Sequence, residues 1–137
     1  MVLDSLPDWV SQPPDVGDII TCYYPSDPKR ALRPALVLEL RVSDDLEEFS
    51  VRVAYGTSKT DRPEREHVSL TITDNGQVAM CGLAVPTRFD LETQATITWS
   101  QKECGCWRGF TSPVIGHLTK GLQVDCAHKL NEMQKKK

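Results

Sequence analysis

Short segments in which apolar residues occupy every second position run through most of this chain. Two stretches show the alternation plainly: Phe49, Val51, Val53 and Tyr55 in one, and Val68, Leu70 and Ile72 in the other. A period of two residues is typical of a β-strand with one buried face. From Pro34 to Val42 the residues are nearly all apolar, which predicts a central strand buried on both faces over much of its length. The chain is thereby constrained to a β-rich fold.

The remaining strand predictions are shorter. Ile19, Ile20, Cys22 and Tyr24 indicate a first strand that ends at the turn-forming residues 25–28. Residues 85–89 and 95–99 predict two further strand pieces, whereas residues 77–83 show no clear period. The sequence Asp74-Asn75-Gly76 is a strong turn signal that predicts the close of the strand before it. Residues 100–111 predict a long polar and aromatic loop.

The C-terminal part changes to a helical period. Its apolar residues are spaced by four, four and three positions, which places them on one helix face: Leu122, Cys126, Leu130 and Met133. Thr119 is a suitable N-cap for this helix, which should end in the frayed residues 135–137. Many short strands with one late helix predict a mainly β fold, a small and strongly bent antiparallel sheet carrying a C-terminal helix.

Length and composition predict one domain. A chain of 137 residues suits a single hydrophobic core, and no apolar run approaches the ~18 residues of a membrane span. Residues 1–16 contain three prolines and predict an extended arm that lies on the domain or is partly disordered, so the domain is expected over 17–137. The first residues lack the pattern of a secretory signal, which favours a cytoplasmic location. Five irregularly spaced cysteines argue against a disulfide framework.

A net charge of −3 means that any nucleic-acid binding must use local groups of cations. One such group is Lys29, Arg30 and Arg33, and a second is Lys59, Arg62 and Arg65. The second group lies among three acidic residues, so a solvated surface loop is an equally good interpretation of 59–66. Acidic residues gather near the N-terminus and at 44–48, which makes a dipolar surface plausible.

Polar residues of types suited to binding or catalysis lie at predicted strand ends. Arg33 precedes Pro34 and is held extended by it, and Thr57 and Ser58 end the third strand. Arg88 and Asp90 are two residues apart and project to the same side of an extended backbone. Each group also has a purely structural interpretation. Arg33 can pair with an acid such as Asp18 or Asp27, Thr and Ser commonly cap strands, and Arg88 with Asp90 can form a surface ion pair.

Taken in order, these segments resemble the PemK/MazF family of toxin endoribonucleases. The resemblance rests on Gly17-Asp18-Ile19, on Arg33-Pro34-Ala35-Leu36-Val37, on Gly56-Thr57-Ser58 and on Arg88-Phe89-Asp90, and it runs from about residue 17 to about residue 130. It implies an SH3-like barrel with appended helices, a fold also found in the gyrase poison CcdB. Periodicity alone does not distinguish that barrel from other small β-rich folds.

The resemblance also implies an activity. The family cuts single-stranded RNA, including mRNA, without a metal or other cofactor, by attack of the 2′-hydroxyl on the adjacent phosphate. By this resemblance Arg33 binds phosphate, Asp90 acts as base and Arg88 stabilises the transition state, while Thr57 and Ser58 orient the substrate. The neighbouring cations Lys29, Arg30 and Lys59 are expected to contact it as well. DNA should bind without being cut, because it lacks the attacking hydroxyl.

The family further implies partners. Its members usually act as homodimers that RNA crosses, and are silenced by an antitoxin whose disordered acidic segment occupies the RNA groove. One difference from the family concerns residues 25–32, a short loop without the glutamate or histidine usual there, in which Asp27 is the only acid. A non-catalytic SH3-like binding module derived from the toxin fold is therefore the alternative function, and a gyrase-poison role has no specific residue in its support.

The cysteines and tryptophans offer further candidates. Cys104-Gly105-Cys106 and Cys126-Ala127-His128 do not meet the paired spacing of a structural zinc site, so no metal site is predicted. Cys126 falls on the apolar face of the predicted helix, where a thiol is usually just buried. Tryptophans can stack on nucleobases, but Trp99 alternates with core positions and is expected to be packed inside.

Overall fold

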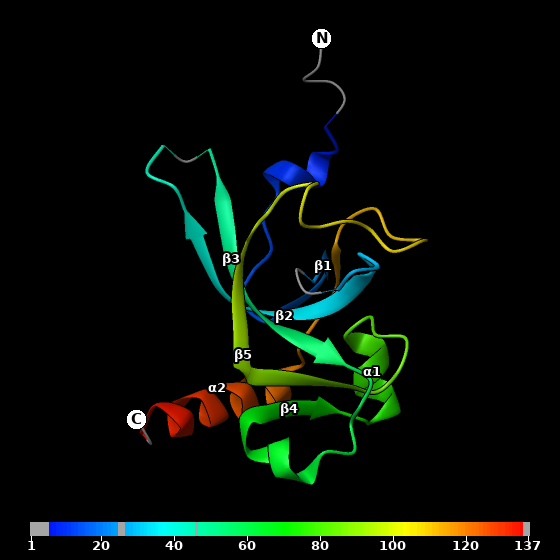
Figure 1. Cartoon of the computed structure of the whole chain (residues 1–137), viewed down its shortest axis with the longest axis vertical. Helices are drawn as coiled ribbons and strands as arrows, with labels where there is room; N and C mark the ends of the chain where they lie inside the picture. Colours follow the sequence, from blue (N-terminus) through cyan, green and yellow to red (C-terminus); the bar gives the residue numbers. More distant parts are fainter. Residues whose placement is uncertain (1–5, 25–26, 46, 136–137) are drawn as a thin grey trace.

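The computed structural model describes residues 6–24, 27–45 and 47–135 of the chain. Its main feature is one antiparallel sheet, built from β1 (Asp18–Tyr23), β2 (Leu32–Val42), β3 (Phe49–Thr57), β4 (Ser69–Ile72), β5 (Thr87–Thr98) and β6 (Val114–His117). The strands lie in the order β4-β5-β3-β2-β1-β6. The sheet curls into a half-barrel, with β5 as a long bent strand along it (Figure 1). The predicted mainly β fold with a C-terminal helix is confirmed.

The C-terminal helix α2 (Lys120–Lys135) lies beneath the sheet beside β4 (Figure 1). Its first turn is capped as predicted, because the Thr119 hydroxyl accepts a hydrogen bond from the Leu122 N–H at 3.3 Å. Leu122 and Cys126 are buried, and the last two members of the predicted apolar face, Leu130 and Met133, are half-buried against the same cluster. The helical period therefore identified the buried face correctly.

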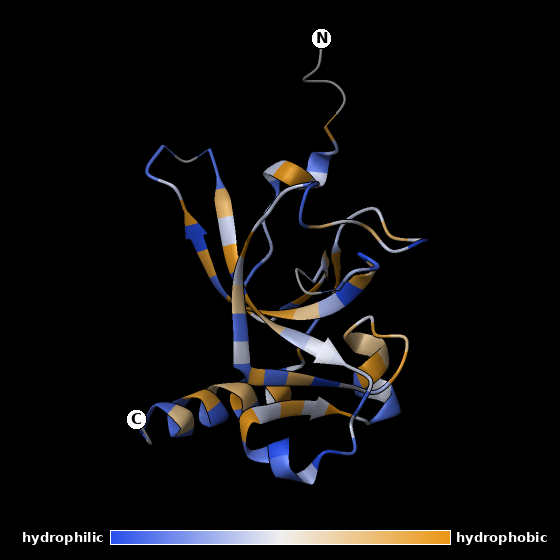
Figure 2. Ribbon diagram, in the orientation of Figure 1, coloured by the Kyte–Doolittle hydropathy of each residue, from blue (hydrophilic) through white to orange (hydrophobic). Residues whose placement is uncertain are grey.

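Two apolar clusters lie on the two faces of the sheet. Alternation along β2 decides which residues enter each, since Leu36 joins one cluster while Ala35 and Val37 join the other. The three consecutive buried residues confirm that β2 is covered on both faces at its centre. Apolar positions recur along the strands at the centre of the molecule, while the tip of the β2–β3 hairpin is hydrophilic (Figure 2).

The first cluster packs under α2 and the second under the N-terminal segment. In the second, Trp9 of the 3₁₀ helix η2 (Asp8–Ser11) meets Trp99 edge to face, with ring centroids 5.0 Å apart. The Trp99 indole N–H donates to the Trp9 carbonyl at 2.8 Å, which satisfies a buried donor. Trp99 is thus packed as predicted, and residues 6–16 of the predicted arm lie on the domain. Residues 1–5 of that arm lie outside the described residues.

Strand β4 ends at Ile72, before Asp74-Asn75-Gly76, as predicted, but these three residues do not form a tight turn. Asp74 is instead the N-cap of a short helix, α1 (Asn75–Met80), and its carboxylate accepts from the Gln77 N–H at 3.0 Å. Aspartate favours turns and helix N-caps through the same short-range hydrogen bond, so the local signal suits both structures. The segment 77–83, which showed no clear period, contains most of this helix.

Two further strand predictions need correction. The segments 85–89 and 95–99 were predicted as separate pieces, but one continuous strand, β5, covers residues 87–98. Its pairing with β3 shifts register between Ala54 and Gly56, which face Gln94 and Phe89, so the extra residues of β5 form a bend. Strand β6 was not predicted, since its four residues include one glycine and one histidine. No helix in the described part of the chain is long and apolar enough to cross a membrane.

Candidate functional site

Tyr24 fixes the ends of β2 and β3 against each other. Its hydroxyl accepts a hydrogen bond from the Gly56 N–H at 2.7 Å, donates to the Pro34 carbonyl, and lies 2.9 Å from the Gly56 carbonyl. The hydroxyl thus bridges the Gly56 N–H of one strand and the Pro34 carbonyl of the other. The strand ends that carry Arg33 and Thr57 are thereby held in place.

A glycine is required at position 56 because β5 and β2 both approach its Cα closely. A Cβ atom there would lie 2.8 Å from Thr87 Cγ2, 2.9 Å from Phe89 Cε1 and 3.1 Å from the Pro34 carbonyl oxygen. Two of these contacts are closer than side-chain carbons are found, so a larger residue would push β5 away from β3. The residue before Thr57 is thus a glycine for packing reasons.

Arg33 stands at the start of β2 with a half-exposed side chain, 49% accessible. Its Nε donates to Oδ2 of Asp27 at 3.0 Å, and its guanidinium lies 5.7 Å from the centre of the Tyr24 ring. Within the described residues, the two terminal nitrogens of Arg33 donate no hydrogen bond. This geometry orients a permanent cation and leaves its outer edge able to bind a phosphate in bidentate fashion.

Thr57 and Ser58 follow at the end of β3. The Thr57 hydroxyl oxygen accepts from the Lys59 N–H at 3.2 Å, which is the capping role that strand-end threonines often have. Because the oxygen is engaged as an acceptor, its own hydrogen is free to point outward as a donor. Thr57 and Ser58 line a pocket of about 220 Å³ together with Arg33, Pro34 and Thr87. Three residues predicted for the site are therefore gathered around one hollow.

Arg88 lies on β5 and is 8% exposed. Its guanidinium donates to the Lys59 carbonyl at 3.1 Å and to the Ser69 hydroxyl at 3.0 Å, and Nη1 lies 3.4 Å from Oδ2 of Asp90. A buried arginine needs such partners, because an unpaired charge out of water is costly. Arg88 is thus a fixed positive charge that joins β3, β4 and β5.

Asp90 is the most heavily bonded carboxylate of the site. It accepts from Arg65 at 3.0 and 2.9 Å, from Arg88, and from the backbone N–H groups of Glu92 and Thr93 at 3.0 and 3.3 Å. The two backbone bonds close the bend of β5. Partial burial by itself raises the pKa of Asp90, but the Arg65 and backbone hydrogen bonds outweigh it and hold the pKa below its ordinary value. Asp90 is therefore ionised and a weak proton acceptor.

The predicted residues follow one another across three neighbouring strands. Arg33 and Thr57 line the same pocket, and Thr57 is the direct partner of Arg88 in the β3–β5 ladder. Directly opposed residues project to one face of a sheet, and Asp90 lies two positions along on that face. We call Arg33, Thr57, Arg88 and Asp90 the polar track. Arg88 and Asp90 do not line the 220 Å³ pocket. We call the Arg33 end of the track, which lines that pocket, the open end, and the largely buried Asp90 end the closed end.

The three expected substrate-binding cations lie at different places. Lys59 follows the track directly, and its carbonyl anchors Arg88. Lys29 and Arg30 lie in the loop between β1 and β2, where the Lys29 N–H donates to Oδ1 of Asp27 at 2.9 Å. This bond, followed by those from Arg33, lowers the pKa of Asp27 below its ordinary value. The backbone of this loop is therefore joined to the Arg33 end of the track through Asp27.

Arg65 and Tyr24 each have a structural role in this region that the sequence did not predict. Arg65 bridges Asp90 to Glu92, with 2.9 Å between its Nη2 and an oxygen of each. Tyr24 was predicted only as a strand residue, yet its hydroxyl joins β2 to β3. Neither role has a local sequence signal, since both depend on a partner far along the chain.

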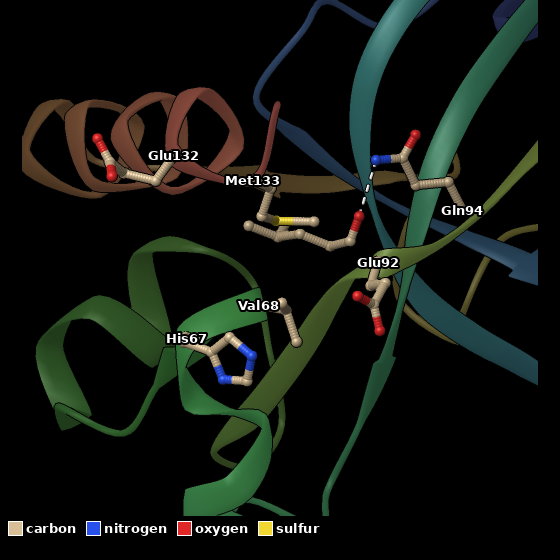
Figure 3. A pocket seen from close by; sticks show the side chains of 7 residues that line it. His67, Val68, Glu92, Gln94, Glu132 and Met133 are labelled. Carbon is tan, nitrogen blue, oxygen red and sulfur yellow. Dashed lines mark hydrogen bonds between the residues drawn. The ribbon is translucent and has the colours of Figure 1, made fainter. Parts of the chain in front are cut away.

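A wider pocket of about 460 Å³ lies beside the closed end of the track. His67 and Val68 line it from the segment before β4, Glu92 and Gln94 from β5, and Glu132 and Met133 from α2 (Figure 3). The Glu92 carboxylate faces this pocket and also pairs with Arg65. His67, Glu92 and Glu132 line the same pocket, but no three His, Cys, Asp or Glu side chains within the described ranges are close enough to hold a metal ion.

The cysteines are divided between the two apolar clusters, with Cys22, Cys104 and Cys106 at one and Cys81 and Cys126 at the other. Cys104 belongs to the apolar cluster under Trp9, while Cys126 belongs to the cluster under α2, on the other face of the sheet. All five thiols are free. Burial raises the pKa of Cys104 to about 12, and Cys126 is buried as its helix position predicted. A zinc site made from both residues is incompatible with this arrangement.

No protein-family model matches this sequence, and the search of curated proteins found no match.

Proposed function

We propose that this protein is a toxin of the PemK/MazF type, a metal-independent endoribonuclease that cuts single-stranded RNA. One observation carries the proposal, the polar track, in which the residues selected by the resemblance follow one another across β2, β3 and β5. These residues come from separate parts of the chain, and the resemblance made no use of their contacts. Their juxtaposition supports a shared role.

The chemistry needs few groups. The 2′-oxygen of one nucleotide attacks the adjacent phosphorus, the bond to the 5′-oxygen breaks, and a 2′,3′-cyclic phosphate and a 5′-hydroxyl result. One carboxylate takes the proton of the 2′-hydroxyl, and the leaving oxygen gains a proton from water. The outer nitrogens of Arg33 bind the phosphate, the Thr57 hydroxyl donates to it, and the fixed charge of Arg88 stabilises the extra negative charge.

Two carboxylates compete for the role of proton acceptor. Asp90 has its oxygens occupied by Arg65, Arg88 and two backbone N–H groups. Asp27 accepts fewer hydrogen bonds, one from Arg33 and one from the Lys29 N–H, and it lies in the loop where the family carries its additional acid. Its position beside the phosphate-binding arginine favours Asp27 as the acceptor and gives Asp90 the role of orienting Arg88.

The experiment is a 5′-end analysis of RNA incubated with pure protein in excess EDTA. Products with 5′-hydroxyl ends are expected from the wild type. Arg33→Ala should cut about a hundredfold to a thousandfold more slowly, because losing a phosphate-binding cation costs about 2.7 to 4 kcal/mol of transition-state stabilisation. Arg41→Ala is the matched control, since Arg41 is also an exposed arginine of β2 but sits near the hairpin. Equal rates for the Arg33 variant and the wild type would refute the assignment.

A second candidate function is favoured by the saturated bonding of Arg88 and Asp90. Both side chains are explained by the bend of β5 alone, which suits a non-catalytic module that binds RNA through Arg33 and the loop cations. Asp27→Asn separates the two functions. A nuclease that uses Asp27 loses cleavage and keeps RNA binding, whereas a binding module shows no cleavage in the wild type. Silencing by an acidic antitoxin segment, a homodimer and a cytoplasmic location belong to the proposed toxin role.

A further inference from the structure

A third pocket, of about 420 Å³, adjoins the open end of the polar track. It lies between the β1–β2 loop and the chain that follows β5, and its lining includes Tyr23, Asp27, Arg30, Thr96, Lys102 and Glu103. Asp27 connects it to the phosphate-binding end, because Oδ2 of Asp27 is 3.0 Å from Nε of Arg33. A volume of a few hundred Å³ is what small-ligand sites have. A nucleotide whose phosphate meets Arg33 can therefore place its base here.

Arg30 is held in this pocket at a conformational cost. Its φ is +51°, a left-handed backbone that is rare for a residue with a side chain and costs about 1 to 2 kcal/mol. Three contacts maintain it: the Arg30 N–H donates to the Asp27 carbonyl at 3.1 Å, Nη2 donates to the Lys102 carbonyl at 3.2 Å, and the guanidinium lies 4.8 Å over the Tyr23 ring. Strain of this kind collects at ligand clamps. The planar guanidinium, backed by Tyr23, is a platform on which a base can stack.

Glu103 is fixed at the wall of the pocket. Its carbonyl accepts from the Tyr23 N–H at 2.9 Å, and Oε2 of its carboxylate accepts from the Thr98 N–H at 3.1 Å. Among the described residues, Oε1 accepts no hydrogen bond. The neighbouring Lys102 supplies an exposed ammonium to the same pocket. The pocket thus presents a positioned carboxylate beside a cation, next to a stacking surface.

This combination matches one base. Guanine carries two adjacent donors, N1–H and the N2 amino group, beside the O6 acceptor, whereas adenine, cytosine and uracil do not present two donors side by side. A carboxylate accepts from both donors, and an ammonium donates to O6. We propose that this pocket is a guanine subsite, in which Glu103 and Lys102 bind the Watson–Crick edge and Arg30 stacks on the ring. The inference rests on the proposed function, since it takes the ligand to be part of the RNA substrate.

The test measures binding without cleavage. Fluorescence anisotropy would use 2′-O-methyl oligouridine hexamers, in which the attacking hydroxyl is blocked, each carrying one guanine, inosine or adenine. The guanine hexamer should bind roughly tenfold tighter than the other two, because inosine lacks the N2 amino group and adenine reverses the donor pattern. Glu103→Gln should bring the three affinities together, since the amide can still accept from Thr98 but cannot accept from two donors.

Arg30→Gly tests the stacking role of Arg30 in a variant that is expected to stay folded. Glycine adopts a positive φ without strain, so the variant should be as stable as the wild type or more so, while its affinity for the guanine hexamer falls several-fold. Arg41→Ala should leave every affinity unchanged. Equal binding of all three hexamers by the wild type, or a guanine preference that survives Glu103→Gln, would overturn the subsite. Binding of GMP as tightly as the hexamer would overturn its assignment to RNA.

Failure of this inference is distinguishable from failure of the proposed function. A protein that cuts RNA in an Arg33-dependent manner but shows no guanine preference lacks the subsite and remains a nuclease. A protein that prefers the guanine hexamer but does not cut RNA has the subsite and is a binding module.

Discussion

Tyr24 and Tyr55 lie against each other with tilted rings, and their hydroxyl groups differ in what they do. Tyr24 and Tyr55 have ring centroids 3.9 Å apart. The Tyr24 hydroxyl joins Pro34 to Gly56, while the buried Tyr55 hydroxyl has no hydrogen-bond partner among the described residues. Burial, with the charge of Glu103 among the lesser causes, raises the pKa of Tyr55 to about 12, so the group is a neutral phenol at ordinary pH. The same functional group is thus structural in one residue and unsatisfied in the other.

This contrast predicts opposite effects for one chemical change. Tyr24→Phe leaves the buried Gly56 N–H without its acceptor and should lower the free energy of unfolding by about 1 to 3 kcal/mol. Tyr55→Phe removes a hydroxyl that makes no bond and should change it by less than about 0.5 kcal/mol, or raise it. Urea unfolding of both variants measures the difference. Equal changes in the two variants would mean that the hydrogen bonds of the Tyr24 hydroxyl do not stabilise the β2–β3 contact.

At the scale of elements, α2 supports the track through one lysine. Lys129 Nζ donates to the Ser69 carbonyl at 2.7 Å and to the Glu66 carbonyl at 3.0 Å, which ties the helix to β4 and to the 3₁₀ helix η3 (Pro63–Val68). Ser69 also accepts a hydrogen bond from Arg88 through its hydroxyl. The helix therefore fixes β4, whose Ser69 accepts a hydrogen bond from the buried Arg88 of β5.

Lys129→Met tests this brace. Methionine keeps the apolar stem but loses both hydrogen bonds, so the free energy of unfolding should fall by about 1 to 2 kcal/mol. Lys135→Met is the control on the same helix, because its exposed pair with Glu132 at 3.5 Å contributes little. Guanidinium unfolding at matched salt compares the two variants. A loss no larger for Lys129 than for Lys135 would show that apolar packing alone holds the helix.

The elements also show where sequence reasoning succeeds. Strands β3 and β4 and helix α2 are predicted by the period of their apolar residues, and β1 and β2 by short apolar runs. The bend of β5 has no such signal, since it is made by hydrogen bonds between the Asp90 side chain and the backbone of residues beyond it. In the candidate site, Arg33, Thr57 and Ser58 could be selected at strand ends. Arg65 and Glu103 could not, because their roles exist only once distant segments meet.

At the scale of the whole molecule, the net charge of −3 is compatible with RNA binding because the charges are separated. Asp44, Asp45, Glu47 and Glu48 lie between β2 and β3 at the hairpin, while Arg33 and Thr57 lie at the opposite ends of these strands (Figure 1). Nine residues of β3 span roughly 26 Å at about 3.3 Å each. This is about three times the Debye length of about 8 to 10 Å at physiological salt. The hairpin acids are therefore screened from the track.

The separation of the charges predicts how RNA affinity depends on salt concentration. The logarithm of RNA affinity should fall linearly with the logarithm of salt concentration, with a slope of about −0.7 for each phosphate contacted in a single strand. Arg33→Ala should make the slope shallower by about 0.7, because one phosphate contact is lost. Replacing Asp44, Glu47 and Glu48 by their amides should change the affinity less than about twofold at physiological salt. Anisotropy titrations with the guanine hexamer give all three results. A large gain in affinity from the hairpin amides would mean that RNA passes near the hairpin and not over the polar track.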